Sequence, residues 1–148
     1  MSEKAPLVLD PTDATHVAAL ERLGSDVIGW FTTVRADGSP HAVPVWFYWH
    51  EDRALVMSEP DTAKVRNVRR GSPALLHLHT RADGDGVVIL EGSAAISERS
   101  STEWLPEIGE AYTAKYAAAM EAYGMGLEAI AEKFHVVIEV VPTKLQAW

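Results

Sequence analysis

Four cationic side chains lie close together in residues 58–73, SEPDTAKVRNVRRGSP, although the whole chain carries a formal net charge of −8. They are Lys64, Arg66, Arg69 and Arg70. Ammonium and guanidinium groups at this density can hold a phosphate or carboxylate through charge-assisted hydrogen bonds. The same spacing is also typical of a solvated helix surface, so this segment by itself leaves both interpretations open.

Helical geometry separates these four cations. We expect a helix that begins after Asp61 as its N-cap, which places Lys64 in the first turn, where free N–H groups already make the potential positive. At about 100° per residue, Lys64 and Arg69 flank the buried side of this helix. Arg66 and Arg70 point away from it. Lys64, with Arg69, could therefore reach a bound phosphate, whereas the outer two arginines stay undecided between solvent and an acidic ligand.

Two histidines, His77 and His79, share one face of an expected strand and could begin a metal or haem site. No cluster of Asp, Glu or His with ligand spacing accompanies them, and the chain has no cysteine, so we predict that no metal is bound. The G-x-S-x-G, H-E-x-x-H, Walker and G-x-G-x-x-G motifs are also missing from the sequence. Hydrolase and kinase activities are therefore disfavoured, and no side chain is identified as a catalytic acid or base.

The composition, with 47% hydrophobic and 23% charged residues, is typical of a soluble globular protein. The 148 residues fit one domain, 1–148. Excess carboxylates disfavour nucleic acids and anionic membranes as partners. Because no basic segment precedes an apolar run at the start, and no apolar stretch approaches the roughly 20 residues of a membrane-spanning helix, we expect a cytoplasmic protein that acts on a small-molecule substrate.

The order of predicted elements indicates the fold class. Six β-rich runs are separated by turn compositions such as RADGSP and HEDR. Residues 100–134 have helical apolar spacing, and we expect Pro106 and the glycines at 124 and 126 to divide this region. Mainly antiparallel strands with inserted helices predict an α+β, mainly β fold, a six-stranded antiparallel split β-barrel with short helices.

One of these runs, HAVPVWFYW at residues 41–49, is apolar on both alternating faces. A strand of a small barrel turns only one face to its own core. The outer face should therefore be covered by another subunit, by a flat ligand or by the chain's own long helix. Pro44 cannot donate a ladder hydrogen bond, which suits a bulge or a sheet edge.

Three motifs in order give the chain a family resemblance. T-T-x-x-x-D-G-x-P, P-V-W-F and K-x-R-N lie within residues 27–97. In this order they resemble the flavin and deazaflavin oxidoreductases of the pyridoxamine 5'-phosphate oxidase-like FMN-binding split-barrel superfamily, which residues 135–148 resemble more loosely. The resemblance implies a homodimer with cofactor sites at the subunit interface.

The same resemblance implies which residues bind the cofactor. The strand 43–46 would lie against its ring system, residues 57, 58 and 64 would hold its phosphate, and residues 67 and 69 would lie near the phosphate. Residues 79 and 148 match positions from which the partner chain closes the site. The implied cofactor-binding residues are Val43, Pro44, Val45, Trp46, Met57, Ser58, Lys64, Asn67, Arg69, His79 and Trp148.

Departures from the family pattern favour one branch of the superfamily. Ala63 stands where the phosphate-oxidase branch usually has arginine, and VVPTKLQAW has no clear counterpart of that branch's C-terminal arginine and tryptophan motif. AKVRNVRRGSP and PVWF are more similar to the branch that uses the deazaflavin coenzyme F420. The resemblance thus implies hydride transfer from reduced coenzyme F420 to a small conjugated organic substrate.

Two alternatives stay open: an FMN-dependent oxidase or reductase of the same fold, and a non-enzymatic cofactor- or haem-binding protein. The charge argument also predicts that Lys64→Ala weakens cofactor binding much more than Arg70→Ala does.

Overall fold

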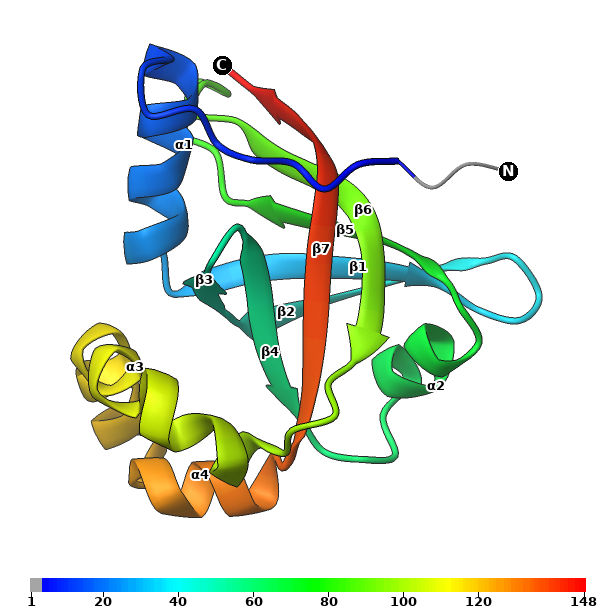
Figure 1. Cartoon of the computed structure of the whole chain (residues 1–148), viewed down its shortest axis with the longest axis vertical. Coiled ribbons are helices and arrows are strands. Elements are labelled where there is room, and N and C mark those ends of the chain that lie inside the picture. Colours follow the sequence, from blue (N-terminus) through cyan, green and yellow to red (C-terminus); the bar gives the residue numbers. More distant parts are fainter. Residues whose placement is uncertain (1–3) are drawn as a thin grey trace.

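A strongly curled antiparallel sheet of seven strands forms the centre of the protein (Figure 1). The computed structural model describes residues 4–148. In spatial order the strands are β2 (Pro40–Trp46), β1 (Ile28–Val34), β5 (Pro73–Leu78), β6 (Val88–Ile96), β7 (Val136–Ala147), β4 (Arg53–Ser58) and β3 (Tyr48–His50). All neighbouring pairs are antiparallel. The fold is α+β and mainly β, as the sequence predicts.

The prediction of six strands is wrong, because the apolar run at residues 41–49 is not one strand. Phe47 interrupts it, so that β2 forms one edge of the sheet and β3 the opposite edge. Phe47 is fully buried, and its N–H and carbonyl bond to the hydroxyl of Tyr116 rather than to a strand. A side chain of helix α3 (Ser101–Tyr123) thus satisfies backbone groups that a sheet neighbour would otherwise satisfy.

The inside of the curled sheet is filled by alternate residues of its strands. Side chains of two helices that pack against the sheet complete this core. In β1 every second residue is buried, as period-two geometry requires. Helices α1 (Ala14–Ser25) and α2 (Ala63–Arg69) pack onto this core. Its members include Leu23, Phe31, Val56, Val65, Val68, Leu76, Leu90 and Ile138.

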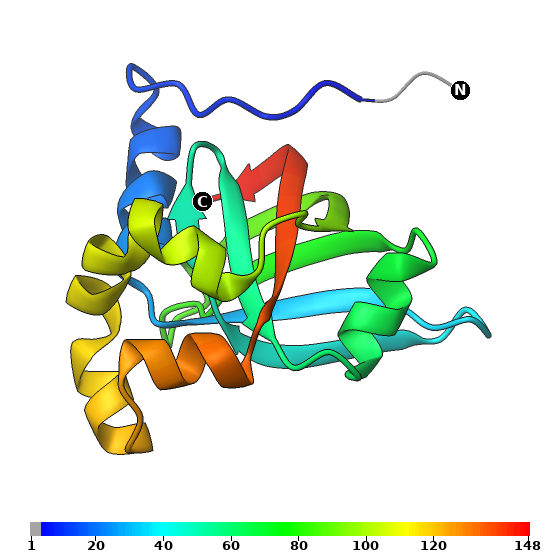
Figure 2. The ribbon, with the colours of Figure 1, turned by 60° about the horizontal axis from the view of Figure 1, so that its bottom comes forward.

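A second apolar cluster lies outside the sheet, where α3 and α4 (Leu127–Lys133) pack against β4 and β7 (Figure 2). Leu55 and Val137 come from the strands, and α3 and α4 supply most of the remaining side chains. Helix α3 and helix α4 are separated at Gly124, which caps α3 with a left-handed φ of 83°. The predicted division at the glycines is therefore confirmed.

Two expectations about helix ends are wrong. Helix α3 continues through Pro106, because a proline in the second turn removes one hydrogen bond near an end that is held by a capping box of Ser100 and Glu103. The N-cap of α2 is Thr62 and not Asp61, since the hydroxyl of Thr62 accepts from the N–H of Val65 at 3.5 Å. The first difference removes an expected break in α3, and the second moves the start of α2 by one residue.

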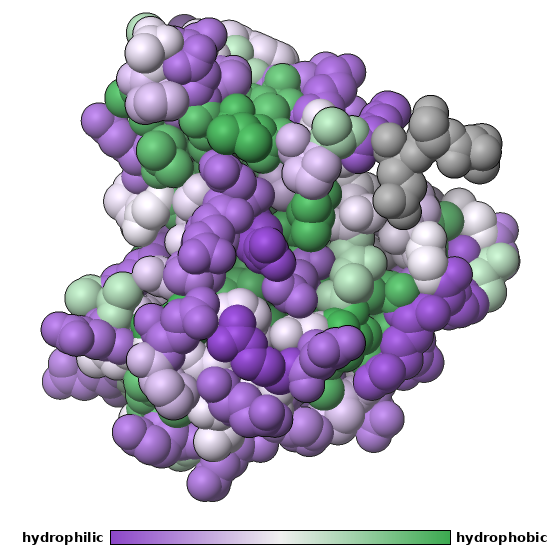
Figure 3. Space-filling model, viewed as in Figure 1, coloured by the Kyte–Doolittle hydropathy of each residue, from purple (hydrophilic) through white to green (hydrophobic). Residues whose placement is uncertain are grey.

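The segment before α1 runs across β7, where the N–H of Leu7 donates to the carbonyl of Pro142 at 2.8 Å. The surface seen in Figure 3 is mostly hydrophilic, with an apolar patch beside α1. Among residues 4–148, no helix is both long and apolar enough to cross a membrane.

Candidate functional site

The edge strand β2 and the basic helix α2 meet at a cavity of about 330 Å³. Helices α3 and α4 form its other wall. The lining residues are Pro44, Val45, Trp46, Met57, Ser58, Glu59, Thr62, Lys64, Tyr112, Tyr123, Ile130 and Phe134. The structure thus brings together six residues of the sequence-predicted cofactor set, namely Pro44, Val45, Trp46, Met57, Ser58 and Lys64.

One end of the cavity is polar and is built where β4 ends and α2 begins. Ser58 is 2% exposed, and its hydroxyl donates to the carbonyl of Glu59 at 2.8 Å. The hydroxyl oxygens of Ser58 and Thr62 lie 3.0 Å apart, so Thr62 can donate to Ser58 while it caps the helix. These contacts fix the loop that presents Lys64.

Lys64 is the cation of this polar end. Its side chain is half-buried, and burial lowers its pKa below the usual value, while the charge of Glu59 acts in the opposite direction. Within residues 4–148, its ammonium group has no hydrogen bond and no ion pair. The nearby Glu59 forms no ion pair with Lys64 and neutralises this partly desolvated cation only in part, so an anion bound in the cavity would stabilise it further.

The other end of the cavity is aromatic. The ring of Trp46 stacks on that of Tyr116, with centroids 4.9 Å apart and planes at 16°. Tyr123 meets Trp46 edge-on at 6.1 Å, and Phe134 lies 6.4 Å from Tyr123. Flat aromatic walls of this kind suit a planar ligand.

The break at Phe47 positions Trp46, and two residues of α3 hold that break. The hydroxyl of Tyr116 accepts from the N–H of Phe47 at 2.8 Å and lies 2.6 Å from its carbonyl and 2.9 Å from that of Val27. Lys115 donates to the same Phe47 carbonyl at 2.7 Å, and its ammonium lies 3.9 Å from the centre of the Phe47 ring. One wall of the cavity therefore depends on α3.

The stability of the protein should depend on pH through Lys115. Burial lowers its pKa to about 8, while Asp26 acts in the opposite direction. An unfolded chain holds this proton more tightly, because the pKa of the lysine returns there to its ordinary value of 10.5. The free energy of unfolding should therefore rise between about pH 8 and pH 10.5.

Replacing this lysine tests that expectation. In Lys115→Met the part of the rise due to this group should disappear, because no proton is exchanged at position 115. Urea denaturation at pH 7 and pH 9.5 measures how the free energy of unfolding of each protein depends on pH. The other groups titrate alike in both proteins, so their effect cancels when the two are compared. The same pH dependence in both proteins would contradict the assignment.

Five of the sequence-predicted residues do not line the cavity. Val43 packs against the core of the sheet, and Arg69 is exposed on the flank of α2 opposite Lys64. Asn67 is buried, where its amide donates to the hydroxyl of Thr33 at 3.0 Å. The implied cofactor contacts of these residues stay predictions.

His79 and Trp148, the other two, also lie away from the cavity. The indole N–H of Trp30 donates to Nε2 of His79 at 2.8 Å. Trp148 is 67% exposed, and its carbonyl accepts from the N–H groups of Gly86 and Val87. Because the sequence resemblance assigns both positions to the partner chain, one chain alone does not test their roles.

The two outer arginines of α2 are exposed but hydrogen-bonded locally. Arg66 donates to the carbonyl of Asp61 at 2.6 Å. Arg70 donates to Oδ1 of Asn67 at 2.6 Å and to the carbonyl of Val34 at 3.3 Å. Arg70 therefore links α2 to β1, a structural contact that is neither of the two roles expected for it from the sequence.

Sequence reasoning missed the wall that α3 and α4 contribute. The helical spacing of residues 100–134 predicts an apolar face that includes Tyr112 and Tyr123, and nothing in it distinguishes Ile130 or Phe134 as a site residue. The spacing of Tyr112, Tyr116 and Tyr123 places three tyrosines on one side of α3. That pattern was the available signal, although it did not show which strand the tyrosines would face.

Comparisons with known proteins agree with this geometry. A family model described as pyridoxamine 5'-phosphate oxidase matches residues 15–148. A search of curated proteins found no match.

Three solved structures share the fold. A conserved hypothetical protein of Mycobacterium tuberculosis has 20% identity and a TM-score of 0.67, covering 100% of this chain and 89% of that one. An F420 reductase has 18% identity and a TM-score of 0.59, with 85% and 94% covered. A haem storage protein of Vibrio cholerae has 14% identity and a TM-score of 0.58, with 95% covered in both. At these identities the likeness concerns the fold alone.

Proposed function

Because the chain belongs to the pyridoxamine 5'-phosphate oxidase family, we propose that it is an oxidoreductase that binds coenzyme F420 and reduces a small conjugated organic substrate. The observation that carries the proposal is the ammonium of Lys64 in the cavity between β2 and α2, which has no hydrogen bond or ion pair to the rest of residues 4–148. A cofactor phosphate is the anion that this half-buried cation lacks. The fold of the F420 reductase is similar.

The residues of the cavity fit such a cofactor. Strand β2 pairs only with β1 among the described strands, so the backbone groups along its free edge can bond to the polar edge of a ring system. Trp46 offers a flat surface, and Lys64 with the adjoining loop offers the phosphate end. The cavity therefore joins a ring-binding part to an anion-binding part.

In this proposal the cofactor supplies the chemistry, and the protein binds, orients and shields it. Reduced F420, when bound, supplies the hydride. Strand β2 orients its ring, Lys64 fixes its phosphate, and helices α3 and α4 shield the reacting atoms from water.

Coenzyme F420 is favoured over FMN by the residues around Lys64. Ala63 stands at the position where the phosphate-oxidase branch usually has arginine. The exposed Arg66 and Arg70 could meet an acidic tail that FMN lacks. Haem is disfavoured at His79, because its Nε2 accepts from the indole of Trp30 and is not free to bind iron.

A titration decides between the two cofactors. The purified protein is mixed with F420 or FMN, and binding is followed by cofactor fluorescence. We expect a micromolar or lower dissociation constant for F420 and a much higher one for FMN. Tight FMN binding without F420 binding would overturn the choice of cofactor, and absence of both would overturn the function.

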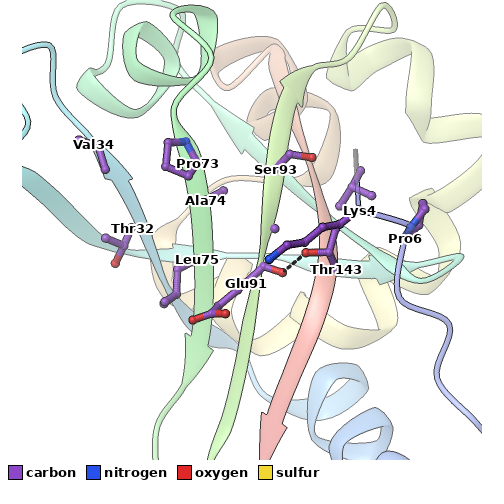
Figure 4. A pocket seen from close by; sticks show the side chains of 12 residues that line it. Lys4, Pro6, Thr32, Val34, Pro73, Ala74, Leu75, Glu91, Ser93 and Thr143 are labelled. Carbon is purple, nitrogen blue, oxygen red and sulfur yellow. Dashed lines mark hydrogen bonds between the residues drawn. The ribbon is translucent and has the colours of Figure 1, made fainter. Parts of the chain in front are cut away.

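We further propose that a second copy of the chain covers the outer face of β1, β5 and β6. Figure 4 shows the open groove there, about 600 Å³ in volume. Its walls include Val34, Pro73 and Leu75, and uncharged side chains dominate it. A surface of this type is suited to a subunit contact, and the family resemblance implies a homodimer.

A charge placed in this groove should separate the subunits. Leu75 is partly buried in the free chain, and Leu75→Glu would bury an unpaired carboxylate in the contact. We expect the mass measured by light scattering to fall from that of a dimer to that of a monomer. Thr113→Glu, on the exposed side of α3, serves as the control and should leave the mass unchanged. A monomeric wild type would refute the proposal.

A further inference from the structure

Tyr112 contributes a phenol to the wall of the cavity. The residue is 3% exposed and lies in the wall of the cavity. Within the described range 4–148, its hydroxyl makes no hydrogen bond. The hydroxyl of Tyr116, one turn later on α3, contacts two backbone carbonyls and one N–H. Of these two neighbouring tyrosines, only Tyr116 is thus explained by the fold.

The ring of Tyr112 is held firmly, so its hydroxyl has a fixed place. Its centroid lies 4.8 Å from that of Tyr116 and 6.2 Å from that of Tyr48. Leu55, Ile130 and Val137 belong to the same apolar cluster. The hydroxyl oxygen is not among the fully buried polar atoms that lack a partner in residues 4–148, so it keeps contact with solvent, and an acceptor group of a bound ligand could take the place of water there.

The surroundings also keep this phenol neutral. Burial raises the pKa of Tyr112 above its ordinary value. At neutral pH the group therefore retains its proton and can donate a hydrogen bond.

One end of the cavity suits the cofactor phosphate, and the other suits a flat substrate. Lys64 lies at the polar end and would bind the cofactor phosphate. Tyr112 belongs to the wall that α3 and α4 contribute, together with Tyr123 and Phe134. This wall has aromatic surface and a phenolic hydroxyl but no charged side chain among the cavity residues of α3 and α4.

We propose that Tyr112 determines which substrate binds, by donating a hydrogen bond to the carbonyl oxygen of a flat conjugated ketone or related acceptor held against the aromatic wall. The proposal rests on the proposed function, and it adds the substrate class and the residue that recognises it. The hydrogen bond orients the substrate and draws electron density from the conjugated system, which favours hydride acceptance.

The test compares two probes that differ in one acceptor group. Benzylideneacetone carries a conjugated carbonyl, and 1-phenyl-1-butene is a flat hydrocarbon analogue without it. Their dissociation constants are measured by calorimetry with the purified full chain, with and without F420. We expect Tyr112→Phe to weaken binding of the ketone about 5- to 10-fold, as for the loss of one neutral hydrogen bond, and to leave binding of the hydrocarbon unchanged.

Thr113→Ala is the control, since Thr113 lies on the exposed side of the same helix and is not among the residues that line this cavity. It should leave both constants unchanged. Equal ketone binding by the wild type and Tyr112→Phe would overturn the proposal, as would an equal loss for both probes or absence of ketone binding to the wild type. The F420 and FMN constants of the same proteins test the proposed function separately, so the two failures can be distinguished.

Discussion

Lys64→Ala is expected to raise the dissociation constant of the cofactor about 10- to 100-fold. A hydrogen bond to a charged group contributes about 1.5–3 kcal/mol, and each 1.4 kcal/mol is a tenfold change in affinity. The side chain is half-buried and has no competing partner among the described residues, so water replaces its contact poorly. Titration of F420 into the wild type and the variant, followed by fluorescence, measures the effect.

The control variants separate this site from general charge. Arg69→Ala removes an equal charge from the opposite flank of the same helix and should change the constant by less than about threefold, as for a screened surface charge. Lys64→Arg keeps the charge and should retain part of the affinity. Arg70→Ala is a less clean comparison than the sequence suggested, because Arg70 also bonds to Asn67. Equal constants for Lys64→Ala and Arg69→Ala would defeat the phosphate assignment.

Gly92→Ala is expected to lower the free energy of unfolding by about 3 kcal/mol, at the upper end of the usual cost of overpacking. Gly92 lies at a bulge in the antiparallel pairing of β6 with β7, since the register shifts between Glu91 and Gly92. A Cβ at this position would lie 2.1 Å from the carbonyl oxygen of Val141 and 2.7 Å from Cα of Pro142. Both atoms belong to the backbone, so the strands must separate to relieve the clash.

Gly24→Ala provides a control of opposite sign. A Cβ at Gly24 meets no atom within 4 Å, and the residue lies inside α1, where alanine reduces the freedom of the unfolded chain. The variant should be more stable by about 0.4–1 kcal/mol. Urea denaturation measures both proteins. A Gly92→Ala variant as stable as the wild type would show that the bulge relaxes, contrary to our account.

Local patterns predicted those parts of the site that lie on one element. Helical periodicity places Lys64 and Arg69 on opposite flanks of the buried side of α2. Pro44 indicated a sheet edge, and β2 is one. In these cases the spacing of residues along one helix or strand decides the direction of each side chain, and that spacing is written in the sequence.

The remaining parts of the site depend on contacts between segments that are distant in the sequence. The break at Phe47 depends on Tyr116 and Lys115, which lie almost seventy residues later in the chain. Likewise, the strands and helices around Tyr112 decide that its hydroxyl has no hydrogen-bond partner among the described residues. The sequence by itself determined the mainly β fold class, the basic helix and the family resemblance, because these follow from local periodicity and motif order. Only the tertiary structure decided that α3 and α4 close the cavity, because packing between remote elements is set by the whole fold rather than by any one segment.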